Sequence, residues 1–181
     1  MIQLEGIIPA IRGMKGFDKI LKSEKKHIVF LETRLSLLLH AVKHAKQMDK
    51  QVLVHVDLIQ GLKADEYGLD FLIRDMKVDG IISTRGSAIT YAKRNNVTSI
   101  QRVFALDSHA LENSIKMINT LKPDYIEILP GIVPFILEEV YEKTGIPIIA
   151  GGLIRTKQDI EYAFSKGARA ITTSMPLLWE L

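Results

Sequence analysis

The 181-residue sequence contains no cysteine, which excludes disulfides, thiolate nucleophiles and cysteine-based zinc sites. It also lacks any apolar run approaching the roughly 18 residues that a membrane-spanning helix needs. Its first residues show no basic segment followed by a long apolar stretch, as a signal peptide would, so we expect a cytoplasmic protein with no membrane partner. No linker or low-complexity segment is visible, so we expect one domain over residues 1–181.

A strong excess of one charge is also missing. The formal net charge is +3, and a dedicated non-specific nucleic-acid binder has a much denser basic stripe. Lysines cluster near residues 22–26 and 43–50, but neither cluster is interleaved with aromatic side chains that could stack on bases. Composition alone is therefore compatible with RNA binding without predicting it.

What the chain does contain is a repeated pattern of a short apolar run, a polar or glycine-bearing turn, and a helical stretch. Strict alternation of this kind predicts a parallel sheet covered by helices, and eight units predict closure into a compact single-domain (β/α)8 TIM-like barrel. An open doubly wound sheet is the alternative, and it would require several of the strands to be wrong. The predicted strands are Ile7–Ile11, His27–Leu31, Val52–Val56, Gly80–Ser83, Thr98–Phe104, Tyr125–Leu129, Pro147–Ala150 and Ala170–Thr173.

Glycines and hydroxyl side chains stand at the ends of the last two predicted strands. Gly151 and Gly152 follow the seventh strand, and Thr173 and Ser174 close the eighth. Either pair alone can simply form a tight turn or a helix cap. Together they occupy the two strands whose loops, with a helix N-terminus, commonly bind phosphate in this fold. Glycine allows backbone amides to approach an anion, and hydroxyls add donors, so this end of the chain predicts a phosphate site.

Charged side chains occupy other strand ends. Arg12 and Arg102 can each pair with a phosphate or with a facing carboxylate such as Glu127, and the sequence leaves both interpretations open. Arg85 and Arg155 are further candidates in loops. These positions predict a cationic mouth at the C-terminal end of the barrel.

Three acidic residues allow a different chemistry. Glu32, Asp57 and Glu127 could jointly hold Mg²⁺ or act as acid and base. His55 and Asp57 are two apart on a predicted strand, so their side chains should share a face. For His55, however, a hydrogen-bonded structural network is the preferred interpretation.

Several longer motifs are spread over nearly the whole chain. They are Ile8–Arg12, His55–Lys63, Asp65–Gly68, Asp79–Arg85, Ile100–Phe104, Ile126–Pro134, Pro147–Ile154 and the ending Thr172–Trp179. With these motifs the sequence resembles one family nearly from end to end, the glycerol uptake operon antiterminator regulatory proteins.

This resemblance implies a transcription antiterminator that responds to glycerol 3-phosphate and binds the leader mRNA of glycerol-utilisation genes. It further implies that Gly151, Gly152, Thr173 and Ser174 hold the ligand phosphate. The residues implied at the glycerol end are Arg12, Asp57, Arg102 and Glu127. The family pattern at Glu32–Arg34 does not specify a role, and the oligomeric state stays open, a homo-oligomer included.

On this interpretation the protein is not an enzyme and needs neither metal nor cofactor. The alternative is a barrel enzyme acting on a phosphorylated small molecule, a phosphodiesterase or an isomerase. Its polar mouth with Glu32, His55, Asp57 and Glu127 is the feature that favours it. Because one fold hosts many chemistries, the fold does not decide between the two.

Overall fold

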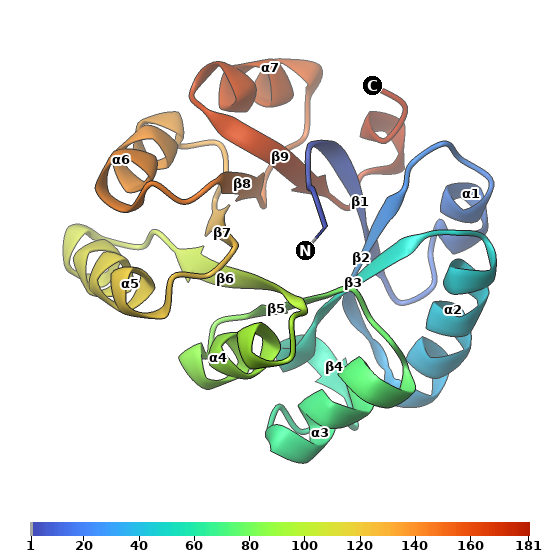
Figure 1. Cartoon of the computed structure of the whole chain (residues 1–181). Coiled ribbons are helices and arrows are strands. Elements are labelled where there is room, and N and C mark those ends of the chain that lie inside the picture. The colour runs from blue at the N-terminus through green and yellow to red at the C-terminus, as the bar shows by residue number, and fades with distance from the viewer. Residues whose placement is uncertain (1) are drawn as a thin grey trace.

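The computed structural model describes residues 2–181 as a closed parallel barrel of eight strands. Each strand pairs in parallel with its neighbours, and pairing of β1 with both β2 and β9 closes the ring (Figure 1). This confirms the predicted barrel. The barrel strands are β1 (Gly6–Arg12), β2 (His27–Arg34), β3 (Gln51–His55), β5 (Gly80–Ser83), β6 (Thr98–Phe104), β7 (Tyr125–Leu129), β8 (Ile148–Gly151) and β9 (Ala168–Thr173).

Helices surround the strands on the outside of the ring (Figure 1). They are α1 (Phe17–Leu21), α2 (Leu35–Gln47), α3 (Glu66–Asp70), α4 (Gly86–Arg94), α5 (Ser108–Leu121), α6 (Pro134–Thr144) and α7 (Lys157–Ser165). Two apolar clusters join them to the barrel: one lies mainly between β1–β5 and α1–α4, the other mainly between β6–β9 and α5–α7. None of the helices within residues 2–181 has the length and apolarity required to cross a lipid bilayer.

Three stretches depart from a plain alternation of strand and helix. The third strand ends at His55, one residue before its predicted end, because the chain enters a 3₁₀ turn at Val56–Leu58 and then forms a two-residue strand, β4 (Ile59–Gln60), beside β2. The helical segment before β5 is divided into α3 and a π-helical turn at Phe71–Asp75. After β9, Pro176–Leu178 forms a single 3₁₀ turn.

The inside of the barrel is apolar at its centre. Because side chains alternate along a strand, residues such as Ala10, Leu53, Ile100, Tyr125 and Ala170 face inward and form one cluster. The same alternation continued toward the strand ends turns His55, Arg102, Glu127 and Thr172 inward. The apolar interior therefore ends in a polar layer at the C-terminal end of the barrel.

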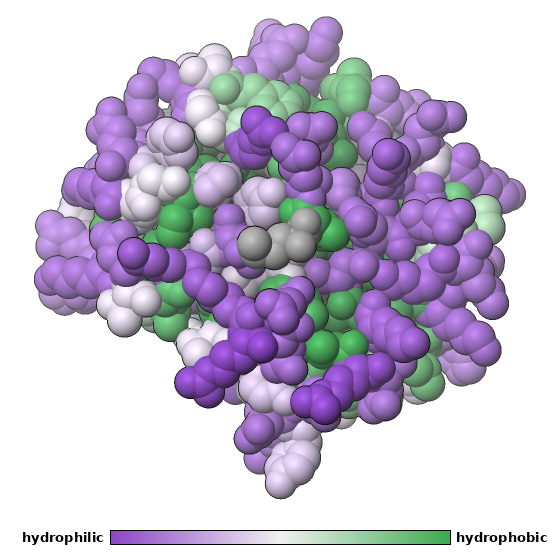
Figure 2. Space-filling model, viewed as in Figure 1, coloured by the Kyte–Doolittle hydropathy of each residue, from purple (hydrophilic) through white to green (hydrophobic). Residues whose placement is uncertain are grey.

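The N-terminal end of the barrel is closed by the first residues of the chain. Leu4 is fully buried, and its amide donates to the Tyr125 hydroxyl at 3.0 Å. The Ile2 amide donates to Thr98 Oγ1 at 3.1 Å. Figure 1 shows the start of the described chain, just before β1, over the centre of the ring, and Figure 2 shows a mainly hydrophilic surface on this face. A ligand that enters the barrel must therefore approach from the opposite end.

Candidate functional site

A cavity of about 190 Å³ opens among the C-terminal ends of the strands. Six of the eight residues predicted to bind ligand line it, namely Arg12, Arg102, Glu127, Gly152, Thr173 and Ser174. The structure therefore brings the ends of β1, β6, β7, β8 and β9 to one place. It adds lining residues that the sequence did not single out as ligand contacts: Ala10, Leu31, Leu129, Leu153, Ile154, Thr172 and Met175, together with Arg155, which the sequence offered as a loop candidate.

Arg102 and Glu127 form a buried ion pair on the cavity floor. They are partners in the β6–β7 register, and Arg102 Nε donates to Glu127 Oε2 at 2.7 Å. Their side chains are 7% and 1% exposed. Within residues 2–181, neither terminal guanidinium nitrogen of Arg102 donates to a protein acceptor. Glu127 thus holds the guanidinium in place, and two of its nitrogens stay available to a ligand.

A third residue fixes this pair. Thr172 Oγ1 donates to Glu127 Oε1 at 2.6 Å, so both carboxylate oxygens of Glu127 are engaged. Gly151 leaves the space for this arrangement, because a Cβ there would lie 2.7 Å from Thr172 Oγ1 and 2.9 Å from Glu127 Oε1. The lack of a side chain at Gly151 therefore serves the Glu127–Thr172 contact, and Gly151 itself does not line the cavity. Thr172 could have been identified from the alternation of β9, in which it follows Ala170 on the inner face.

Unused backbone donors lie in the turns after β8 and β9. Gly152 has a φ of 72°, a left-handed conformation that glycine adopts without strain. Within residues 2–181, no protein oxygen accepts from the amides of Gly152, Leu153 or Ser174. The exposed side chain of Arg155 also reaches this cavity. Free amides and a cation at one wall are the components from which proteins build anion-binding sites.

The helix that follows these turns does not supply the donors. Its first turn is closed by a capping box, in which Thr156 accepts from the Asp159 amide and Asp159 accepts from the Thr156 amide. The Thr173 hydroxyl is also engaged, since it lies 3.4 Å from the Ile154 carbonyl and accepts from the Met175 amide at 3.2 Å. Thr173 therefore holds the two turns together at the wall of the cavity.

Arg12 stands at the rim of the cavity in a weak ion pair. Its Nη1 lies 3.5 Å from Glu32 Oε2, and the two side chains are 63% and 49% exposed. Exposed pairs of this kind contribute about 0–1 kcal/mol to stability, so Arg12 can turn toward an anion at little cost. Glu32 and its neighbours Thr33 and Arg34 face a separate groove of about 280 Å³.

Asp57 is not brought to the cavity. It lies in the 3₁₀ turn after β3, where it accepts from the Thr84 amide at 2.8 Å and from Ser83 Oγ at 2.9 Å. Arg85 Nε is 3.4 Å away. Asp57 therefore joins the turn after β3 to the turn after β5. Its carboxylate is bonded to these protein groups and does not line the cavity.

His55 is buried without a hydrogen-bond partner. It is 2% exposed, and neither ring nitrogen bonds to another group among residues 2–181. The expected hydrogen-bonded network around His55 is therefore wrong, because the chain turns away after β3 and directs Asp57 to Ser83 and Thr84. Burial, helped by the positive charge of Arg102, lowers the pKa of His55 to about 4, against opposing effects of Glu127 and Asp57. The imidazole is neutral at physiological pH.

Acidic and histidine side chains do not gather into a metal site in this mouth. Among residues 2–181, no three His, Asp or Glu side chains are placed to share an ion. Glu127 is bonded to Arg102 and Thr172, Asp57 is bonded across to the β5 turn, and Glu32 faces its own groove. The three carboxylates that could jointly hold Mg²⁺ thus belong to three different local environments.

Comparison with known proteins gives matches over almost the whole chain. A family model described as "Glycerol-3-phosphate responsive antiterminator" matches residues 7–179. The crystal structure of the glycerol uptake operon antiterminator regulatory protein of Listeria monocytogenes is 44% identical, with 97% of this chain and 95% of that chain covered, at a TM-score of 0.93. A glycerol uptake operon antiterminator-related protein of Thermotoga maritima is 32% identical, with coverage of 98% and 99% and a TM-score of 0.87.

A curated relative covers the same range. Protein YgcP of Escherichia coli K12, itself described as uncharacterized, is 33% identical over 181 residues, which is 100% of this chain and 95% of YgcP. Enzymes also share the barrel at lower identity, which shows the fold alone.

Proposed function

Because the chain belongs to the family of glycerol-3-phosphate responsive antiterminators, we propose that its mouth cavity binds glycerol 3-phosphate and that the protein regulates transcription in response. The observation on which this rests is the group of unpartnered donors at one cavity. The amides of Gly152, Leu153 and Ser174 lack protein acceptors, and the cation Arg155 lines the same wall.

The phosphate lies, on this proposal, in the turns after β8 and β9. Amides there donate to its oxygens, and Arg12 and Arg155 balance its charge from the rim. The carbon chain of the ligand points down toward Arg102, whose terminal nitrogens face no protein acceptor within residues 2–181. Glu127 and Thr172 act by holding Arg102 in position.

The response is a change in affinity for leader mRNA of glycerol-utilisation genes, in the cytoplasm where the transcripts are made. Leu153 and Met175 both line the cavity and are 51% and 36% exposed, so the same turns face the ligand and the outer surface. A ligand that orders these turns shifts the population toward the RNA-binding state by its difference in affinity for the two states.

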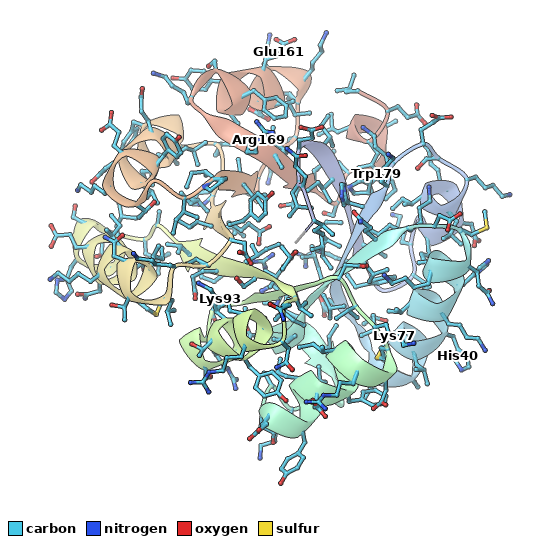
Figure 3. All side chains as sticks on the ribbon, in the orientation of Figure 1. His40, Lys77, Lys93, Glu161, Arg169 and Trp179 are labelled. Atoms are coloured by element: carbon cyan, nitrogen blue, oxygen red, sulfur yellow. The ribbon has the colours of Figure 1, made fainter. Side chains whose placement is uncertain are left out.

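Binding of the ligand is tested by calorimetric titration of glycerol 3-phosphate against a matched pair of variants. Arg155→Gln removes a cation from the cavity wall, and we expect about a tenfold loss of affinity because one charge-assisted contact is lost. Arg169→Gln is the control, since Arg169 is also exposed but lies at the opposite end of the barrel, paired with Glu5 (Figure 3). Equal affinities for both variants and the wild type would argue against this cavity.

The regulatory part is tested by filter binding of leader RNA with and without glycerol 3-phosphate. We expect the ligand to change RNA affinity in the wild type and in Arg169→Gln, and to require a higher concentration in Arg155→Gln. RNA affinity that is independent of ligand in the wild type would contradict the proposal.

We further propose that the protein has no catalytic activity of its own. The carboxylates that an enzyme would use are engaged with protein donors: Glu127 with Arg102 and Thr172, and Asp57 with Ser83 and Thr84. Such engaged carboxylates are suited to positioning other groups and are poorly placed to accept a proton from substrate.

A further inference from the structure

His55 is a polar group that the proposed phosphate site does not use. It faces the barrel interior in the same alternation as Leu53, and it pairs in register with Ile82 of β5. In the β2–β3 pairing Phe30 lies opposite Val54, so the next residues, Leu31 and His55, are neighbours on adjacent strands. Leu31 lines the cavity. His55 thus lies one strand beyond the described wall of the cavity, in the polar layer that includes Arg102 and Glu127.

The burial of this imidazole without partners is costly. A buried nitrogen that loses its hydrogen bonds to water and gains none in the protein destabilises the fold. Both ring nitrogens of His55 are in this state among residues 2–181. Leu31 and Ile82 beside it are apolar, so the fold itself gives this polar group no hydrogen-bonding role.

The charges around His55 define the chemical class of its partner. Arg102 and Glu127 already neutralise each other at 2.7 Å, so a second negative charge beside them would find no counter-charge. A neutral imidazole offers one donor and one acceptor, which is the pattern that a hydroxyl group complements. The lowered pKa of His55 keeps the ring in this neutral form.

We propose that His55, together with the terminal nitrogens of Arg102, recognises a neutral hydroxylated end of the ligand and so selects a polyol phosphate over a phosphorylated carboxylic acid. This inference rests on the proposed function, because it takes the phosphate to lie in the turns after β8 and β9. It assigns His55 a ligand-contacting role that determines specificity.

The test separates the two ends of the ligand by calorimetric titration of glycerol 3-phosphate, 3-phosphoglycerate and inorganic phosphate. In the wild type we expect glycerol 3-phosphate to bind at least tenfold more tightly than either competitor. His55→Leu should lose about tenfold in affinity for glycerol 3-phosphate and keep its affinity for inorganic phosphate, whereas His55→Asn, which retains a donor and an acceptor, should recover part of the loss.

Thr33→Val is the matched control. Its hydroxyl is also buried and unpartnered among residues 2–181, but Thr33 lines the neighbouring groove and not the cavity, so removal of the hydroxyl should leave the preference unchanged. A preference for glycerol 3-phosphate that survives in both His55→Leu and His55→Asn would overturn the role of His55 and leave the phosphate site standing. Absence of glycerol 3-phosphate binding in the wild type would overturn both.

Discussion

Two parts of the same barrel mouth use similar residues in opposite ways. In the turns after β3 and β5, Asp57 is bonded to Ser83 and Thr84, so these polar groups satisfy one another. In the turns after β8 and β9, by contrast, the amides of Gly152 and Ser174 have no protein acceptor within the described chain. Polar residues at strand ends therefore indicate where a site can form, and the hydrogen-bonding capacity that the protein leaves unsatisfied marks the part of the mouth that we propose holds the ligand.

The largest expected effect is the loss of Glu127. Glu127→Ala leaves the 7% exposed Arg102 without its counter-charge, and we expect the free energy of unfolding to fall by about 3–5 kcal/mol. Urea unfolding measures this loss. An unchanged dependence of the unfolding free energy on urea concentration would show that the variant and the wild type expose the same surface on unfolding.

Thr172→Val is the milder companion of this substitution. It removes one hydrogen bond to Glu127, and we expect it to lower the free energy of unfolding by about 1–2 kcal/mol. A smaller loss for Glu127→Ala than for Thr172→Val would contradict the role given to the ion pair.

The next effect concerns pH and His55. Its pKa is about 4 in the fold and ordinarily 6.5, so between these values the unfolded chain binds a proton that the folded chain does not. Stability should therefore fall as the pH drops from about 6.5 to about 4, by up to about 3 kcal/mol, and then show no further loss from this group. Urea unfolding at pH 7 and pH 4.5 measures the change.

His55→Leu provides the comparison for that measurement. His27 also has a pKa lowered by burial, and it remains in both proteins, so the difference between them isolates His55. In the variant, the free energy of unfolding should fall much less between pH 7 and pH 4.5 than in the wild type. An identical decline in both proteins would show that His55 is not the neutral buried group described above.

The smallest effect on ligand affinity belongs to the satisfied part of the mouth. Asp57→Ala removes an acceptor shared by Ser83 and Thr84, and we expect a stability loss of about 1–3 kcal/mol without a change in the dissociation constant for glycerol 3-phosphate. Thermal unfolding and calorimetric titration of the same sample give both values. A large loss of ligand affinity with little loss of stability would place Asp57 in the site after all and remove the contrast between the two parts.

The barrel could be predicted from the sequence because its eight apolar runs are separated by clear turns and helices. The same period of two identifies inward-facing residues such as Arg102 and Glu127, since it persists to the end of β6 and β7. It fails at Asp57, where the chain leaves β3 for a 3₁₀ turn and the assumption of a shared face with His55 no longer applies. The preference of a short segment for a 3₁₀ turn over a strand depends on tertiary contacts and is not visible in the pattern.

The location of the site could be predicted better than the hydrogen-bonding state of its groups. Gly151 and Gly152 were expected to do the same thing, yet the first makes room for Glu127 and Thr172 and the second forms a left-handed turn. The free amide of Leu153 has no signature in a side-chain pattern. Unpaired donors and acceptors depend on what the fold brings near them, so they become visible when the strands are assembled.

Trp179 has a practical consequence for all of these measurements. It is the sole tryptophan of the chain, it is 4% exposed, and its indole nitrogen donates to the Thr173 carbonyl at 2.8 Å. On its other side it fills the space beside Gly16, where a Cβ would lie 2.8 Å from the ring. The protein thus contains its own fluorophore one hydrogen bond away from the strand end at the pocket, and intrinsic emission offers a label-free optical signal of events there.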